Sequence, residues 1–246
     1  MAVLITGGTK GIGLAIAKRL SRPGLPIFMA YQRDDEAAAR AGAELAATGA
    51  VPHPVRVDVS APAGARALAA KVAEHVDRLD LVVHGAVKVL VGSLLDADPD
   101  ELTHAITLNG VSLVFVVQAL RPLLRSGSSI IFLSSRGSRQ VVPAYGAIGA
   151  AKALAEALVR YLVPELAPLG VRINCVAPGT LDTEAVRNLF GAETDAFLAA
   201  EAAGNPSGRN ITHDDYTGLV AFLASKEASM IQGQVIFVNG GQYIVD

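Results

Sequence analysis

Cysteine, tryptophan and charge are scarce in this chain. Its 246 residues include one cysteine, Cys175, and no tryptophan, and only 18% of them are charged. A lone cysteine excludes an internal disulfide and a cysteine cluster for a metal ion, and it is typical of the reducing cytoplasm. The formal net charge of -2 provides no basic surface for nucleic acid. We therefore expect a cytoplasmic protein with no metal site and no nucleic-acid partner.

Long uninterrupted apolar runs are also lacking. No stretch reaches the roughly 18 apolar residues that a membrane span needs. The apolar run 111–120 contains Gln118 and stops at Arg121 and Pro122, so it predicts a buried helix. The opening letters MAVLIT have no flanking charge and no separate cleavage site, and they predict a first strand and not a signal peptide. We expect no membrane partner.

Apolar residues, in contrast, make up 51% of the chain, as expected when parallel strands are buried on both faces. Strands and helices alternate without a Pro- or Gly-rich linker, which predicts one doubly wound α/β domain of the Rossmann type over residues 1–246. The expected strands are 2–6, 26–31, 55–59, 79–83, 129–133, 172–177 and 235–238, and the expected helices include 34–48, 63–76, 98–124, 145–166 and 214–224. The polar stretch 180–209 has no strand character and is a candidate substrate lid.

A glycine-rich turn follows the first strand. The letters TGGTKGIG place Gly7, Gly11 and Gly13 between a strand and a helix start, where backbone N–H groups and the helix dipole attract a phosphate. The spacing differs from the commoner GxGxxG of dinucleotide sites. The alternative is a plain turn.

The ends of the next two strands indicate which nucleotide is bound. Gln32 and Arg33 stand where an NAD-type site has an acid for the ribose 2'-hydroxyl, and Arg33 together with Lys10 can clamp a 2'-phosphate instead. This favours NADPH over NADH, with two solvated surface cations as the alternative. Asp58 is placed to accept a hydrogen bond from an adenine amino group, or else serves as the carboxylate at a helix N-terminus, a cap that Ser60 can also provide.

The stretch Ser134 to Lys152 holds a hydroxyl, a phenol and an ammonium group in Ser135, Tyr145 and Lys152. Ser135 follows the fifth expected strand, and the carboxyl ends of parallel strands are where open sheets place their chemistry. These groups can steer the negative charge that develops when a hydride is delivered. Asn109, in the apolar middle of a helix, either braces a kink or holds a water near the active site.

Taken together, these residues resemble the short-chain dehydrogenase/reductase family over essentially the whole chain. The matching residues are TGGTKGIG, Asp58 with Val59, Asn109, Ser135, Lys152, the letters NCVAPG at 174–179 and GQVIFVNGG near the end. The resemblance implies a catalytic set of Ser135, Tyr145, Lys152 and Asn109, and cofactor contacts from Gly7, Thr9, Lys10, Gly11, Ile12, Gly13, Arg33, Asp58, Val59, Gly85, Lys152, Pro178, Gly179, Leu181 and Thr183.

The position of the tyrosine departs from the usual family pattern. Ser135 stands 17 positions before Lys152, as is usual, but Ile148 occupies the usual tyrosine position four residues before the lysine. The available phenol is Tyr145, seven residues before it. Spacings of four and seven return to the same helix face, so the phenol moves about 4.5 Å along the axis.

A phenol farther from the lysine suits enoyl thioester reduction, in which the hydride lands on the β-carbon and charge appears on a carbonyl oxygen two carbons away. The Tyr-x6-Lys spacing is similar to that of enoyl-acyl-carrier-protein reductases, and its context looks most like the NADPH-dependent type III, or FabL-like, branch. By this resemblance, Tyr145 stabilises the enolate, Lys152 holds the nicotinamide ribose and lowers the phenol's pKa, and Ser135 is a secondary donor.

Several alternatives remain open from sequence. The protein is a carbonyl reductase of a secondary-metabolite pathway, or a non-catalytic NADPH-binding relative, if Tyr145 does not serve an enoyl thioester. His84 and Gly85 stand where the family usually has Asn-Asn-Ala-Gly, and His84 is either a proton carrier or a buried neutral histidine satisfied by backbone. The resemblance also implies an acyl-thioester substrate, either free or on a carrier protein, and a homotetramer.

Overall fold

Seven parallel strands form the centre of the molecule, in the order β3-β2-β1-β4-β5-β6-β7. The computed structural model describes residues 1–244, except for the side chains of residues 185, 188 and 189. The strands are β1 (Val3–Thr6), β2 (Pro26–Tyr31), β3 (Val51–Arg56), β4 (Leu79–His84), β5 (Leu124–Leu133), β6 (Arg172–Pro178) and β7 (Val235–Val238). The doubly wound α/β fold predicted from the sequence is therefore confirmed.

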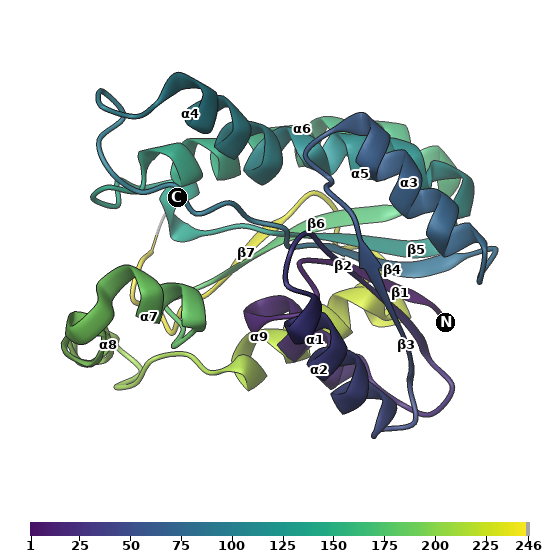
Figure 1. Ribbon diagram of the computed structural model, residues 1–246, viewed down its shortest axis with the longest axis horizontal. Coiled ribbons are helices and arrows are strands. Elements are labelled where there is room, and N and C mark those ends of the chain that lie inside the picture. Colours follow the sequence, from purple (N-terminus) through teal and green to yellow (C-terminus); the bar gives the residue numbers. More distant parts are fainter. Residues whose placement is uncertain (245–246) are drawn as a thin grey trace.

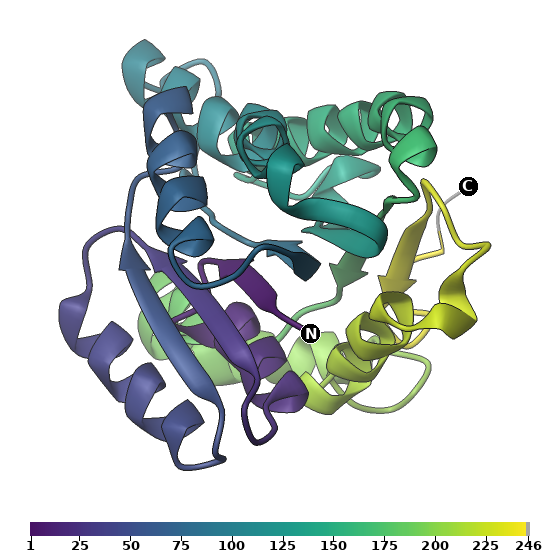
Figure 2. The same ribbon diagram turned by 90° about the vertical axis from the view of Figure 1, so that its right-hand side faces the viewer.

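Helices cover both faces of this sheet (Figures 1 and 2). The helices are α1 (Gly11–Leu20), α2 (Asp35–Ala46), α3 (Pro62–Ala73), α4 (Pro99–Ile106), α5 (Ser112–Leu120), α6 (Gly146–Leu166), α7 (Glu184–Phe190), α8 (Thr194–Ala203) and α9 (His213–Ala224). One buried cluster joins the sheet to α3, α5 and α6, and a second joins it to α1, α2 and α9. Since both faces are covered, the central strand β1 is buried along its whole length.

The third strand is a correction to the sequence prediction. It spans Val51–Arg56, whereas residues 55–59 were expected, so Asp58 and Val59 lie in the turn that follows it. The expected strand began late because Pro52 and Pro54 lack the N–H that a central strand must donate. β3 lies at the edge of the sheet, with β2 as its partner, and an edge strand tolerates proline.

The long helix expected over 98–124 changes its geometry in the middle. A π-helical turn, Thr107–Val111, separates α4 from α5 and contains Asn109. Such single turns inside α-helices are frequently found at functional sites. Asp98 caps the start of α4 by accepting from the N–H groups of Asp100 and Glu101, as the sequence predicts.

Among the described residues, one continuous helical stretch, Pro99–Leu123, is long and apolar enough to cross a membrane by length and composition alone. The core helix of a soluble protein passes the same test, and 44% of the most apolar window is buried inside this molecule. Leu113, Val116 and Leu120 of α5 pack in the main core. This agrees with the buried helix predicted for residues 111–120.

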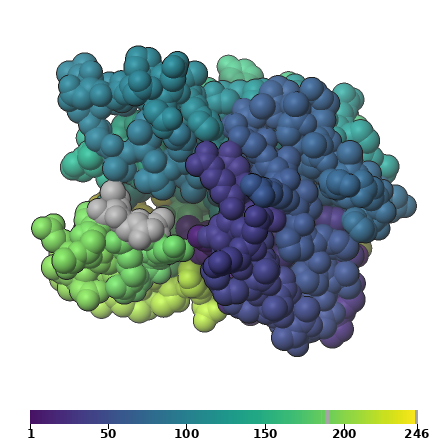
Figure 3. All heavy atoms as spheres, in the orientation of Figure 1, coloured from purple at the N-terminus to yellow at the C-terminus, as the bar shows by residue number. Residues whose placement is uncertain are grey.

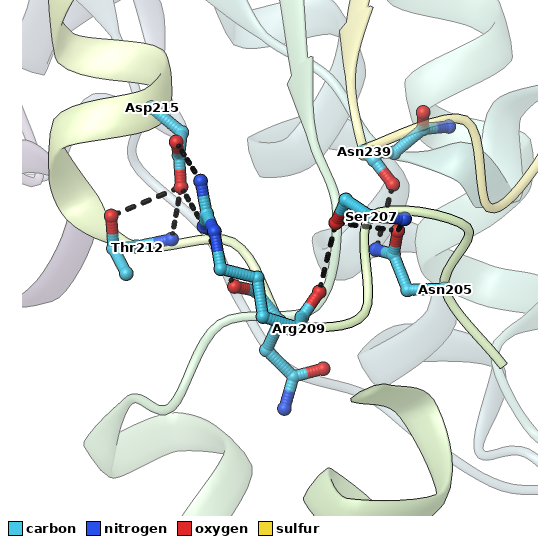
Figure 4. A network of polar contacts seen from close by, with 7 residues as sticks. Asn205, Ser207, Arg209, Thr212, Asp215 and Asn239 are labelled. Carbon is cyan, nitrogen blue, oxygen red and sulfur yellow. Dashed lines mark hydrogen bonds and ion pairs between the residues drawn. The ribbon is translucent and has the colours of Figure 1, made fainter. Parts of the chain in front are cut away.

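The segment 180–209, which contains α7 and α8, stands beyond the carboxyl ends of the strands (Figure 1). Its far end is anchored by polar contacts (Figure 4). Arg209 donates two hydrogen bonds of 2.7 Å each to Asp215, at the start of α9. Asn205 Nδ2 donates to the Asn239 carbonyl at 3.0 Å. The segment is therefore tied both to α9 and to the turn after β7.

Candidate active site

The glycine turn after β1 forms a bare concave surface. Gly7 and Gly11 have positive φ angles of 70° and 48°. A Cβ at Gly7 would lie 2.9 Å from the Gly85 carbonyl oxygen, and one at Gly13 would lie 2.2 Å from the Gly7 oxygen, whereas nothing lies within 4 Å of that position on Gly11. Lys10 begins α1 without a side-chain cap, so the first N–H groups of the helix remain available. This arrangement fits a phosphate.

The two cations predicted for a 2'-phosphate differ in their surroundings. Lys10 Nζ forms ion pairs with Asp34 and, at 3.6 Å, with Glu184 of α7. The hydrogen bond with Asp34 raises the pKa of Lys10 despite some desolvation. Arg33 is exposed and has no ion-pair partner within residues 1–244. Arg33 is therefore the cation that is available to an anionic ligand.

Asp58 joins the ends of β2 and β3. Its carboxylate accepts from Gln32 Nε2 at 2.7 Å and from the Ser60 N–H at 2.9 Å. Burial acts to raise its pKa, but these hydrogen bonds prevail and hold the pKa of Asp58 below its ordinary value. Neither Asp58 nor Ser60 is the N-cap of α3, a position that Ala61 occupies, so the capping alternative is wrong.

His84 ends β4 and is fully buried. Its Nδ1 lies 3.0 Å from Thr6 Oγ1, and its Nε2 lies 2.9 Å from Ser112 Oγ. Ser112 Oγ donates to the Leu108 carbonyl at 2.6 Å, so it must accept from an Nε2–H, which leaves Nδ1 as the acceptor for Thr6. Burial, followed by the Lys152 charge, lowers the pKa of His84 to about 3. Of the two hypotheses for His84, this environment agrees with a buried neutral histidine and not with a proton carrier. The hydrogen-bond partners of its ring are hydroxyl groups, whereas backbone groups were expected.

Asn109 holds the chain that leaves β4. Its Nδ2 donates to the Lys88 carbonyl and its Oδ1 accepts from the Lys88 N–H, both at 2.8 Å. Asn109 lies in the π-helical turn, and its side chain clamps the backbone of Lys88, a contact that neither sequence interpretation named. Lys88 was not identified from the sequence, because nothing in its local pattern reveals a backbone clamp from a residue 21 positions away.

Ser135 and Tyr145 meet over two glycines. Ser135 lowers the pKa of the Tyr145 phenol, so the two hydroxyl groups are neighbours, and Ser135 Oγ accepts from the Gly137 N–H at 3.2 Å. A Cβ at Gly137 would lie 2.7 Å from the Tyr145 ring, and one at Gly149 would lie 2.5 Å from the Gly137 carbonyl oxygen. Because these glycines have no side chains, the turn 134–138, which we call the serine turn, packs directly against the start of α6.

The phenol of Tyr145 is protonated at neutral pH. Burial raises the pKa of Tyr145, and the hydrogen bond from Ser135 and the charge of Arg136 act in the opposite direction. Arg136 is thus a positive charge near the phenol that the sequence did not identify. The preceding residue, Ala144, has a φ of 60°, a left-handed conformation that costs about 1 kcal/mol or more outside glycine.

Lys152 is turned toward the end of β5. Its Nζ donates to the Leu133 carbonyl at 2.7 Å and lies 4.5 Å from the centre of the Phe132 ring. Burial lowers the pKa of Lys152 to about 8, against the opposing effects of Cys175 and Glu156. The ammonium group is therefore partly deprotonated near pH 8.

Glu156 is a buried carboxylate beneath the serine turn, and it was missed in the sequence. It accepts from Ser134 Oγ at 2.5 Å and Ser138 Oγ at 2.6 Å, and Arg139 Nε lies 3.4 Å away. The available signal was its place four residues after Lys152, on the same face of the helix. Glu156 therefore connects α6 to both sides of Ser135.

A second carboxylate, Glu201 of α8, connects the segment 180–209 to the site. It pairs with Arg136 at 3.2 Å and accepts from Thr180 Oγ1 at 2.5 Å. Tyr243 OH donates to it at 3.1 Å, and the Arg136 guanidinium lies 4.1 Å from the centre of the Tyr243 ring. The residue after Ser135 therefore touches both this segment and the C-terminal region.

The remaining cofactor residues predicted from the sequence lie near the carboxyl ends of β1, β3, β4 and β6. Gly85 N–H donates to the Thr6 carbonyl at 3.1 Å, and Gly179 N–H donates to the Val238 carbonyl at 2.9 Å. Thr183 caps α7 by accepting from the Val186 N–H at 3.3 Å. Thr9, Val59 and Leu181 are buried, Ile12 lies in α1, and Pro178 ends β6. Because Lys10 pairs with Glu184, the two groups are neighbours across the carboxyl edge of the sheet.

Known proteins resemble the chain over nearly its whole length. The family model described as "Enoyl-(Acyl carrier protein) reductase" matches residues 7–242. The 1-cyclohexenylcarbonyl-CoA reductase of Streptomyces collinus is 31% identical, over 98% of this chain and 86% of the relative. Versicolorin reductase of Emericella nidulans is 29% identical, over 98% and 94%. The solved RhlG/NADP active-site complex of Pseudomonas aeruginosa has a TM-score of 0.88 and 30% identity, over 98% and 95%.

Proposed function

This chain belongs to the short-chain dehydrogenase/reductase family of NAD(P)-dependent oxidoreductases, and on that premise we propose that it is an NADPH-dependent reductase of 2-enoyl thioesters. The proposal depends above all on Tyr145. This phenol lies beside Ser135, while Ile148, in the usual position of the family's acid, is a buried apolar side chain. The acid is thus displaced along α6, away from Lys152.

The choice of NADPH is supported by the end of β2. Tyr31, Gln32 and Arg33 include no carboxylate for a ribose 2'-hydroxyl, and Arg33 is available to a 2'-phosphate. The glycine turn has room for the pyrophosphate, and Asp58 retains acceptor capacity for an adenine amino group. The bound NADPH supplies the hydride. Lys152, whose Nζ now donates to the Leu133 carbonyl, is the residue that we assign to the nicotinamide ribose.

The role of Tyr145 follows from where charge develops. As the β-carbon of the thioester gains a hydride, negative charge moves to the thioester oxygen, and a proton then adds to the α-carbon. Because burial keeps the phenol protonated, Tyr145 donates a hydrogen bond to that oxygen. Ser135 orients the phenol, and Glu156 holds the turn that carries Ser135. Asn109 holds the opposite side of the site through Lys88.

Tyr145→Phe tests this assignment. We expect the rate of NADPH oxidation with crotonyl thioester to fall by about 100-fold or more, since a positioned acid contributes about that factor or more. The control is Tyr161→Phe on the same helix, whose ring is 75% exposed, and it should retain the wild-type rate. Full activity of Tyr145→Phe would refute the assignment.

Reduction of a ketone is the second candidate. Ser135 and Tyr145 place two hydroxyl groups together, and a ketone oxygen also needs such donors in its transition state. Turnover of ketones without turnover of enoyl thioesters would establish the second candidate, and NADPH binding without any turnover would establish a non-catalytic relative.

We place the protein in the cytoplasm as a homotetramer that acts on a free or carrier-protein-bound thioester. Support for assembly comes from exposed apolar side chains on α6 and before β7, namely Leu154, Tyr161 and Met230. We further propose that the segment 180–209 is the substrate lid, because Glu201 ties it to Arg136. Light scattering of the purified protein measures the assembly directly.

A further inference from the structure

Five large apolar side chains are exposed on the segment that leaves β4, namely Leu95 and the four that come before it. Val87, Val89, Val91 and Leu94 retain 51%, 49%, 39% and 51% of their surface, and we call these four residues the apolar wall. Single exposed apolar residues are ordinary on a protein surface, but a contiguous row of them commonly marks a binding site. The direction in which this row faces decides what it can bind.

The wall faces away from α4. Exposure alternates along residues 87–91, which is the period of an extended chain with side chains on opposite sides. Lys88 lies on the α4 side, because its Nζ contacts Glu101 at 2.5 Å and its backbone is clamped by Asn109. Val87 and Val89 therefore point to the opposite side, toward the carboxyl edge of the sheet.

The wall also ends at the catalytic tyrosine. The Gly92 N–H donates to the Ala144 carbonyl at 2.8 Å, and a Cβ at Gly146 would lie 2.8 Å from a Leu94 methyl carbon. Ala144 and Gly146 are the two neighbours of Tyr145. At its other end the wall begins two residues after Gly85, which touches the glycine turn. The row thus runs from the cofactor side of the site to the phenol.

The space in front of the wall is open. Figure 3 shows a recess in the surface between the blue-to-teal residues at its upper left and the green residues of the segment 180–209 below them. The nearest cation of the segment, Lys88, is turned away and paired, so the wall presents hydrocarbon and no charge. A molecule whose carbonyl oxygen reaches Tyr145 would lay its neighbouring carbons along this row.

We infer that the apolar wall binds the hydrocarbon part of the acyl group and makes the enzyme selective for acyl groups larger than four carbons. The inference rests on the proposed function for the identity of the thioester, but not for the apolar contact itself. Each methylene that is fully buried contributes about fourfold in affinity. An octanoyl group adds four methylenes to a butyryl group, so partial burial suffices for a preference of at least about tenfold.

Calorimetry on the protein loaded with NADP⁺ tests the inference without requiring turnover. The probes are butyryl- and octanoyl-pantetheine, and the variant is Val87→Thr/Val89→Thr, which keeps the shape of both side chains and makes them polar. The matched control is Val51→Thr, because Val51 is 44% exposed and lies at the opposite edge of the sheet. The kcat/KM values for crotonyl and 2-octenoyl thioesters are measured in parallel.

We expect wild type and Val51→Thr to bind the octanoyl probe at least about tenfold more tightly than the butyryl probe, and the double variant to lose most of that ratio. Equal affinities in wild type, an unchanged ratio in the double variant, or no binding of either probe would overturn the inference. A chain-length preference in binding without enoyl turnover would refute the proposed function and support the wall. Enoyl turnover without a chain-length preference in binding would support the proposed function and refute the role of the apolar wall.

Discussion

Replacing the buried lysine by an apolar side chain should stabilise the protein at neutral pH while removing activity. Lys152→Met keeps the length of the side chain and removes an ammonium group that is only 5% exposed. The pKa of Lys152 falls from 10.5 to about 8 in the folded protein, chiefly through burial. Below pH 8 both the folded and the unfolded chain carry the proton, so the folded state pays the full cost of the buried charge, roughly 3 kcal/mol.

The sign of the pH dependence follows from proton binding. Between the folded pKa of about 8 and the unfolded value of 10.5, the unfolded chain binds more protons at Lys152 than the folded one. The free energy of unfolding of the wild type therefore rises with pH through this window, and that of Lys152→Met lacks this contribution. From pH 7.5 to 9.5 the wild type should gain about 2 kcal/mol relative to the variant.

Urea denaturation of both proteins at the two pH values measures this difference. Loss of the hydrogen bond to Leu133 and of the contact with Phe132 lowers the net gain of the variant at pH 7.5 to about 1–2 kcal/mol. The control is Lys71→Met, because the Lys71 side chain is 61% exposed beside Glu74. The free energy of unfolding of this variant should stay within about 0.5 kcal/mol of the wild-type value at both pH values. If the difference in the free energy of unfolding between variant and wild type stays the same at pH 7.5 and 9.5, the buried-charge account is refuted.

Two further substitutions test the cofactor choice and the serine turn. Arg33→Ser should raise KM for NADPH by about tenfold or more, because a charge-assisted contact is lost, while KM for NADH changes little. The control is Arg121→Ser, which is distant and should leave both KM values unchanged. Equal effects of Arg33→Ser on both cofactors, or a similar effect of Arg121→Ser, would exclude a 2'-phosphate contact. Glu156→Gln should lower the free energy of unfolding by about 2 kcal/mol and reduce kcat more than it alters KM, since the hydroxyl groups beside Ser135 lose their charged acceptor. The exposed Glu165→Gln on the same helix is the control, and a wild-type kcat in Glu156→Gln would contradict the positioning role.

Local patterns in the sequence were sufficient for the architecture. The strands Pro26–Tyr31 and Val235–Val238 were predicted at their observed bounds, because each is a short apolar run between turn residues. The start of α6 beside Tyr145 was also predicted, so the distances along the chain from Ser135 and Tyr145 to Lys152 became statements about helix geometry. The family assignment depended on such spacings, and the comparisons confirmed it.

Contacts between distant segments were decided only by the tertiary structure. β3 begins at Val51 because it lies at the sheet edge, which no local signal for Pro52 and Pro54 reveals. His84 is neutral because Thr6 and Ser112 meet it from two other elements. Glu156 reaches Ser134 across 22 residues of sequence.

The sequence by itself determined the doubly wound fold, the glycine turn and the displaced tyrosine, because strand and helix periodicity and spacing along one helix are properties of neighbouring residues. Only the tertiary structure decided that the charge of Arg136 acts on the phenol, and that the apolar wall runs to Tyr145. Charge environments and open surfaces arise where separate elements meet, so they depend on packing that no single stretch of sequence encodes.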